Sequence, residues 1–155
     1  GFKYTHGTPF RRAIEENLID PKKYVILGLR GGLYDPDDLK WAIEQGITII
    51  STDKFYEIGM EESIKIIKDV IGDTPTYLTF DIDGIDPTYA PGTGTPEVGG
   101  INVHESQLLI RNLKDLNFIG ADVVEVSPPF DVNNMTSLIG ATIAFEILCT
   151  MTKTN

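Results

Sequence analysis

Short apolar runs alternate with segments of helical spacing along most of this chain, and this alternation constrains its fold more than any other feature. The apolar runs predict strands over residues 24–28, 47–50, 77–80 and 121–126. Apolar residues spaced for one buried face predict helices over residues 36–45, 60–71, 103–114 and 134–151. Strands that alternate with helices indicate an α/β fold with a mainly parallel sheet, in which ligands gather at the carboxyl ends of the strands.

The size and composition of the chain fit one globular domain. Its 155 residues are 41% hydrophobic and 23% charged, and no apolar run approaches the ~20 residues that span a bilayer. The first residues show neither an initiator methionine nor a signal peptide, so we expect a piece of a longer polypeptide. The single cysteine, Cys149, lies in an apolar helical run, which predicts a core position and a reducing, cytoplasmic compartment.

The net charge of the chain indicates which kinds of binding partner are favoured and which are disfavoured. The chain carries 13 basic and 23 acidic residues, for a net charge of −10. Such a surface disfavours nucleic acid and anionic membranes, so we expect neither as a partner. It favours cationic ligands or metal ions, although an acidic surface also serves solubility alone.

The predicted strand over residues 77–80 ends in a cluster of carboxylates. Asp81 and Asp83 follow it, and Gly84 and Pro87 end the extended run. Residues two apart on an extended chain face the same side, so the two acids would point at one place. Two carboxylates that close repel each other unless a cation lies between them, which indicates a divalent metal ion. A solvated acidic turn is the plain alternative.

A loop over residues 90–100 contains four glycines and two prolines. This composition predicts a shaped loop that exposes backbone groups. Its spacing fits neither the phosphate-binding loop nor the dinucleotide-binding pattern. We expect it to pack over a metal site, with an ordinary surface connection as the alternative.

Three other residues are candidates for function. His6 lies between small residues on a loop, where an imidazole could act as an acid or base near neutral pH or be an ordinary surface residue. Glu125, near the end of the strand over residues 121–126, would need a partner, either a cationic substrate or a structural arginine such as Arg30. His104, near the start of a predicted helix, is expected to be structural.

Four segments occur in an order that resembles a known family: residues 5–13 (THGTPFRRA), 80–87 (FDIDGIDP), 90–100 (APGTGTPEVGG) and 122–128 (DVVEVSP). Together they resemble the C-terminal half of a ureohydrolase, the family of arginase, agmatinase and related guanidino-acid hydrolases. The residues around His6 and the LRGGLY segment at 29–34 are most similar to the agmatinase and guanidinobutyrase branch. The resemblance implies a three-layer α/β/α, arginase-like fold without its N-terminal strands, with residues 1–155 as the C-terminal portion of a single ureohydrolase domain.

The resemblance also implies a role for each matching residue. Asp81 would bridge two Mn(II) ions and Asp83 would bind one of them. A hydroxide shared by the metals would attack the guanidinium carbon of a substrate, agmatine above all, to give urea and putrescine as in polyamine biosynthesis. Glu125 would hold the guanidinium by a forked, charge-assisted pair, and His6 would carry a proton to the leaving amine. Thr95 would steady the metal ligands.

The remaining metal ligands of the family come from patterns that this chain lacks. Gly-Gly-Asp-His and Asp-Ala-His-x-Asp, from the N-terminal half, occur nowhere in the sequence. Two of six expected ligands would bind Mn(II) weakly, so the missing half would come from the same polypeptide or from another chain. The family implies a homo-oligomer, a trimer or a hexamer. Missing strands should also leave a sheet edge and apolar surface uncovered.

Two alternatives remain open. The chain would look the same if it were a catalytically incomplete subunit that stabilises an active partner. The FDIDG segment is also similar to haloacid-dehalogenase-like phosphatases, whose first aspartate is a nucleophile beside Mg(II), although their downstream lysine and Gly-Asp elements are missing here. An EF-hand does not fit, because Asp86 stands at the turn-glycine position and Gly92 at the bidentate-glutamate position.

Overall fold

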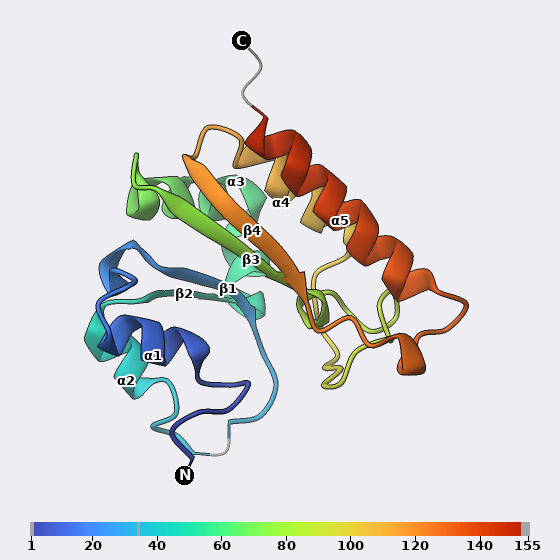
Figure 1. Ribbon diagram of the computed structural model, residues 1–155, viewed down its shortest axis with the longest axis horizontal. Helices are drawn as coiled ribbons and strands as arrows, with labels where there is room; N and C mark the ends of the chain where they lie inside the picture. The colour runs from blue at the N-terminus through green and yellow to red at the C-terminus, as the bar shows by residue number, and fades with distance from the viewer. Residues whose placement is uncertain (1, 34, 153–155) are drawn as a thin grey trace.

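The computed structural model describes residues 2–33 and 35–152, and its elements alternate as the sequence predicts. In chain order they are α1 (Pro9–Glu15), β1 (Val25–Leu29), α2 (Lys40–Gln45), β2 (Thr48–Ser51), α3 (Thr52–Ile71), β3 (Thr76–Asp81), α4 (Val103–Asn112), β4 (Phe118–Val124) and α5 (Met135–Met151). Three 3-10 turns complete the list: η1 (Pro21–Lys23), η2 (Ile82–Gly84) and η3 (Pro128–Phe130). The predicted α/β class is confirmed (Figure 1).

All strand pairs are parallel, but within the described residues they form two separate sheets. β1 pairs with β2, with Ile26 opposite Ile49, and β3 pairs with β4, with Phe80 opposite Val123. No strand pairing in this part of the chain joins the two sheets, whereas the sequence predicted one mainly parallel sheet. Each described strand therefore keeps one edge without a strand partner, as expected where neighbouring strands are missing.

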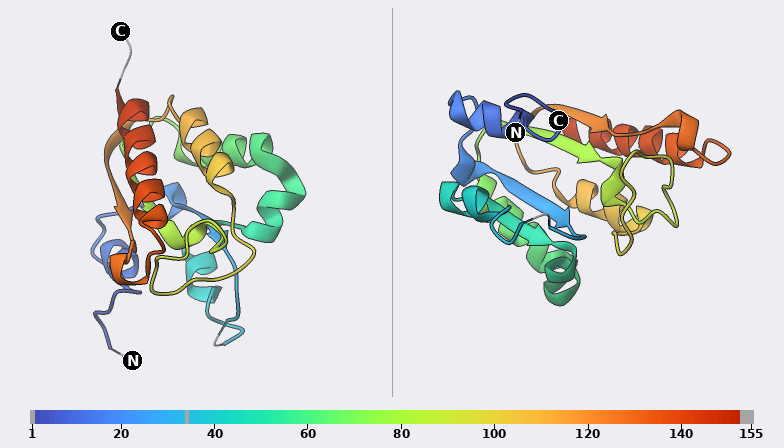
Figure 2. Two further views of the ribbon diagram at one scale, coloured as in Figure 1. Left: turned by 90° about the vertical axis from the view of Figure 1, so that its right-hand side faces the viewer. Right: turned by 90° about the horizontal axis from the view of Figure 1, so that it is seen from below.

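Helices form layers on the sheets. Figure 2 shows α1 and α3 on opposite sides of the β1–β2 pair, which gives three layers there. α5 packs on β4 and against α4, so these two helices cover one face of the β3–β4 pair. The other face carries the exposed Tyr77 ring, whose hydroxyl donates to Asp122 at 3.0 Å.

Two apolar clusters match the two sheets. In the first, α3 and α4 pack with β1 and β2 around Ile50, Phe55 and Leu109. In the second, α4 and α5 pack on β3 and β4 around Ile82, Ile110 and Ile143, each less than 2% exposed. Burying these isoleucines stabilises the fold by about 1.5–3 kcal/mol each. The second cluster continues past the carboxyl end of β3 through Ile82 and Ile85, so the turn that follows the strand is fixed in the core.

Some element boundaries differ from those predicted. α3 begins at Thr52 rather than residue 60, because Gly59 (φ 81°) kinks a longer helix and interrupts its apolar spacing. α2 begins at Lys40 rather than residue 36, since Asp35 and Asp38 form a turn in which Asp35 N–H donates to the Asp38 carboxylate. β4 ends at Val124, so Glu125 lies beyond the strand.

The predicted core position of Cys149 is wrong. α5 is apolar on all sides, but its buried stripe contains Ile139, Ile143 and Ile147, and Cys149 lies outside that stripe and is exposed. An apolar run shows that a helix buries some face and does not show which face. No helix in residues 2–33 and 35–152 is long and apolar enough to cross a membrane.

Candidate functional site

The carboxyl end of β3 brings Asp81 and Asp83 together through a turn. Asp81 is the last residue of β3, and Asp83 lies in the 3-10 turn η2 that follows. The Asp83 N–H donates to Asp81 Oδ1 at 3.1 Å, while fully buried Ile82 fixes the turn in the core. The predicted proximity is therefore present, but its cause differs, because a turn and not strand alternation joins the two acids.

The glycine-rich loop folds back onto this turn. Thr95 Oγ1 donates to Asp83 Oδ2 at 2.9 Å, so Thr95 contacts the residue that the sequence predicted it to steady. The Asp86 carboxylate accepts the N–H groups of Gly99 at 2.7 Å and Gly100 at 3.1 Å, which closes the far end of the loop. The loop is thus a built part of the site and not an ordinary surface connection.

Glu125 approaches the same place from β4. It follows the strand directly, is exposed, and has a left-handed backbone with φ 65°. Such conformations are unfavourable for residues other than glycine and, for a residue such as glutamate, are enriched at functional sites. Arg30 does not neutralise it in the described contacts, since the guanidinium of Arg30 donates to backbone carbonyls, including that of Asp83 at 2.6 Å.

The three acids act on one another electrostatically. Desolvation by the surrounding protein and the nearby charges of Asp83 and Glu125 together raise the pKa of Asp81 to about 6, against the opposing effect of the Asp83 N–H. The Asp81 side chain is still exposed to solvent. A carboxylate held in its less stable charged form beside two like charges is a site that a cation would stabilise.

The residues present fit part of a metal site. Asp81 and Asp83 offer carboxylate oxygens that are already held by hydrogen bonds. In the part of the chain that the structure describes, no group of three or more histidine, cysteine, aspartate or glutamate side chains could hold a metal ion. Asp81 and Asp83 would thus supply two of the six metal ligands that the family resemblance implies.

The two histidines lie outside this cluster. His6 is exposed in the segment before α1, and no hydrogen bond among the described residues joins it to Asp81, Asp83 or Glu125. His104 is exposed in the first turn of α4, so it contributes no core packing. The structure therefore brings together the predicted acids and Thr95 but not His6.

Sequence reasoning missed two residues that shape the site. Asp86 fixes the glycine-rich loop, and the only signal for it was a third acid after the Asp81 and Asp83 pair. Arg30 was considered only as a salt-bridge partner, and its bonds to backbone carbonyls 53 to 68 residues away leave no local signature.

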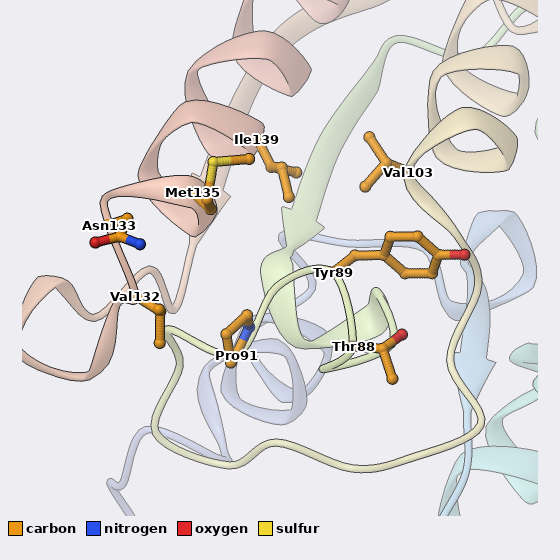
Figure 3. A pocket seen from close by; sticks show the side chains of 8 residues that line it. All are labelled: Thr88, Tyr89, Pro91, Val103, Val132, Asn133, Met135 and Ile139. Carbon is orange, nitrogen blue, oxygen red and sulfur yellow. The ribbon is translucent and has the colours of Figure 1, made fainter.

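An apolar pocket lies beside the site but has different chemistry. Figure 3 shows its lining, in which Met135 and Ile139 of α5 face Tyr89 and Pro91 of the loop. Its volume is about 540 Å³, and none of its lining residues carries a charge. A guanidinium ion would find no carboxylate there, so the acids at the ends of β3 and β4 remain the candidate site.

The comparison with known proteins identifies the family. The model of the arginase family matches residues 1–150, and the chain belongs to that family. It is 53% identical over 150 residues to a guanidinopropionase from Pseudomonas aeruginosa, which covers 97% of this chain and 47% of that protein. It is 42% identical over 151 residues to a mitochondrial agmatinase from Gallus gallus, covering 97% of this chain and 44% of that protein.

Solved structures agree with this assignment. Proclavaminate amidino hydrolase from Streptomyces clavuligerus superimposes with a TM-score of 0.92 and 42% identity, covering 97% of this chain and 50% of that chain. The arginase-like fold is therefore confirmed, and the chain spans about half the length of the curated relatives it matches. Membership of the arginase family leaves no place for the phosphatase alternative.

Proposed function

We propose that residues 1–155 are the C-terminal portion of a single ureohydrolase domain that hydrolyses a linear guanidino compound to urea and an amine. The convergence of Asp81, Asp83 and Glu125 at the carboxyl ends of β3 and β4 carries this proposal. Three carboxylates at one edge suit both a metal centre and a planar cation with several N–H donors. Membership of the arginase family supports the same chemistry.

Asp81 and Asp83 are the residues of this chain that would hold manganese, with two Mn(II) ions in the complete protein. When bound, the ions lower the pKa of water enough to supply hydroxide at neutral pH for attack on the guanidinium carbon. Thr95 holds Asp83 Oδ2, and the Asp83 N–H holds Asp81 Oδ1, so the protein presents both carboxylates in a fixed orientation.

Glu125 and His6 would act on the substrate itself. Glu125 accepts a forked, charge-assisted pair from the guanidinium and so orients its carbon toward the Asp81 and Asp83 pair. The leaving amine needs a proton as the C–N bond breaks, and the His6 imidazole delivers it. His6 is exposed before α1, so its imidazole is open to solvent.

The substrate is a linear guanidino compound, and two subclasses compete. The segments around His6 and at residues 29–34 resemble the agmatinase and guanidinobutyrase branch, and agmatine was the substrate expected first. The 53% identity to a guanidinopropionase supports a short guanidino acid at least as strongly as the 42% identity to an agmatinase supports agmatine. If agmatine is the substrate, putrescine is the product and the protein serves polyamine biosynthesis.

We further propose that the complete protein is a cytoplasmic homo-oligomer, a trimer or a hexamer. The N-terminal half is supplied in the same polypeptide or by another chain. The net charge of −10 supports a small cationic substrate as the partner and disfavours nucleic acid and membranes.

The test is urea release by the assembled protein, with this chain and the missing half together and Mn(II) added. Agmatine, 3-guanidinopropionate and 4-guanidinobutyrate are compared, and we expect urea from at least one. Asp81→Asn should lose bound manganese and urea release together, while Asp53→Asn, an exposed acid of α3, should change neither. Bound manganese without urea from any of the three compounds would contradict the proposal.

The second candidate is a catalytically incomplete subunit. The absence of three clustered metal donors from the described residues favours it. In that case the chain would raise the thermal stability of an active ureohydrolase partner, and Asp81→Asn would leave this effect unchanged.

A further inference from the structure

The chain places an arginine at the carboxyl end of β1 by a local break in the strand. Gly28 adopts φ 96°, and the β1–β2 register shifts between Leu27 and Leu29. A glycine is needed there because side-chain-bearing residues rarely adopt this conformation. The buried Thr52 hydroxyl donates to the Gly28 carbonyl at 3.0 Å and holds the break in place. The chain then turns so that Arg30 points toward the second sheet.

Arg30 joins the two sheets through backbone carbonyls. Its Nη2 donates to the carbonyl of Asp83 at 2.6 Å and to that of Glu97 at 2.6 Å. Its Nε donates to the carbonyls of Glu97 at 3.1 Å and Val98 at 3.2 Å, and Nη1 reaches Gly28 at 3.3 Å. One half-buried side chain thus contacts the end of β1, the turn that carries Asp83, and the loop that ends at Gly100.

These contacts matter because no strand pairing in the described residues connects the sheets at this point. The Asp86 carboxylate holds the end of the loop at Gly99 and Gly100, and the Thr95 to Asp83 bond holds its middle. Arg30 adds a link from both to the end of β1, which neither of these bonds makes. A guanidinium suits the task since its planar fork offers five donors in fixed directions, whereas a lysine ammonium offers three from one point. The described contacts use carbonyls, so the carboxylates of Asp81 and Asp83 stay available for a cation.

We propose that Arg30 is a positioning residue that fixes the Asp83 turn against the loop at residues 97–98 and thereby sets the manganese affinity of the site. This inference rests on the proposed function for its metal. The described hydrogen bonds of Arg30 all go to backbone carbonyls. Arg30 acts through the backbone of Asp83 and through the loop that presents Thr95.

The test compares Arg30→Met with Arg30→Lys and Arg111→Met in the assembled protein. Arg111 pairs with Glu146 between α4 and α5, so its loss removes an arginine and an ion pair away from the site. We expect Arg30→Met to raise the Mn(II) dissociation constant about 10- to 100-fold, as other changes behind metal ligands do. We expect Arg30→Lys to give an intermediate value and Arg111→Met to match the wild type.

A second measurement separates positioning from general stability. In the metal-free protein, hydrogen exchange at the Gly99 and Gly100 amides should rise about tenfold in Arg30→Met, while amides of α4 and α5 exchange as in the wild type. A uniform rise at all amides, or a manganese affinity and loop exchange within twofold of the wild type, would overturn the inference. If the wild type releases no urea from any guanidino compound, the proposed function fails, and the exchange measurement still decides the role of Arg30.

Discussion

Glu125 combines an unfavourable backbone conformation with a position beside the other acids. Its φ of 65° costs about 1–3 kcal/mol, which the fold sustains at the exit of β4. Glu125→Gln keeps the shape and removes the charge that would pair with a guanidinium. In the assembled protein we expect kcat/KM to fall about ten- to hundredfold, since a hydrogen bond to a charged group contributes about 1.5–3 kcal/mol. Steady-state kinetics and metal analysis measure the effect.

Manganese content is the control in this experiment. Glu125→Gln should retain the wild-type amount of metal, because Asp81 and Asp83 are the proposed ligands. Glu61→Gln, an exposed acid on α3, should behave as the wild type in both measurements. Loss of metal in Glu125→Gln would instead place Glu125 among the ligands.

Asp86 gives the loop a dependence on pH. Hydrogen bonds from the side chain and backbone of Thr88, and from the N–H groups of Gly99 and Gly100, lower the pKa of Asp86 to about 2. A carboxyl whose pKa is lower in the folded than in the unfolded state stabilises the fold above pH ~4, and this contribution is lost as the pH falls toward 2. Asp86→Asn should therefore destabilise the protein more at pH 7 than at pH 3.

Urea denaturation at the two pH values measures the difference. An asparagine has one oxygen for three N–H groups, so part of the loss should remain at acidic pH. A destabilisation of equal size at both pH values would show that the charge of Asp86 contributes nothing. Asp73→Asn, an exposed acid after α3, controls for the loss of one negative charge.

At the scale of the elements, the local sequence pattern predicted which helices and strands form better than it predicted which strands pair. The helix at α5 and the strands were found from apolar spacing because each buries one face in a cluster. The first part of α3 was missed, since Gly59 shifts the buried face and breaks the spacing. The division into two sheets could not be predicted from the sequence, because hydrophobic periodicity describes one segment at a time and does not show which strand lies beside it in a sheet.

The loop between β3 and α4 offers a matched pair of glycines. A Cβ on Gly92 would lie 2.8 Å from Asp131 Cα and 2.9 Å from Thr136 Cβ, whereas a Cβ on Gly94 would meet nothing within 4 Å. The Gly92 N–H also donates to Thr136 Oγ1 at 2.9 Å, which fixes the loop to the start of α5. Gly92→Ala should lower the free energy of unfolding by about 1–3 kcal/mol, as overpacking does.

Gly94→Ala should leave the free energy of unfolding within about 0.5 kcal/mol of the wild type. Chemical denaturation compares the two variants directly. Equal stability in both would mean that the loop shifts without cost at Gly92 and is not fixed to α5. Because the same loop presents Thr95 to Asp83, we expect Gly92→Ala also to weaken manganese binding in the assembled protein.

At the scale of the whole molecule, the sequence identified the acids of the site but not what holds them. Asp81, Asp83 and Glu125 could be found because carboxylates at strand ends are conspicuous in an α/β pattern. The bonds of Arg30 to Asp83 and Val98 join residues far apart in sequence, and only the folded chain brings them together. His6 stays a prediction, since it lies outside the acidic cluster.

The molecule also exposes apolar surface that a complete domain would bury. Ile119 on β4 is 67% exposed, and Phe145 and Leu148 on α5 are 65% and 62% exposed. Together with the unpaired strand edges, these residues mark where further strands and helices would pack. The explanation that we propose for both the two-ligand metal site and the uncovered apolar surface is the remaining half of the domain that the longer relatives contain.

This explanation predicts the behaviour of the 155-residue chain alone. Two carboxylates without the remaining ligands should bind Mn(II) weakly, so we expect no urea from agmatine or from guanidino acids. Adding the missing half as a separate polypeptide should bury the exposed face of α5, raise the manganese affinity and produce urea. Binding assays and a colorimetric urea assay on the chain, the half and the mixture measure each step. Robust urea release by the pure 155-residue chain would refute the proposal, because the two carboxylates of Asp81 and Asp83 would then suffice without the other four expected ligands.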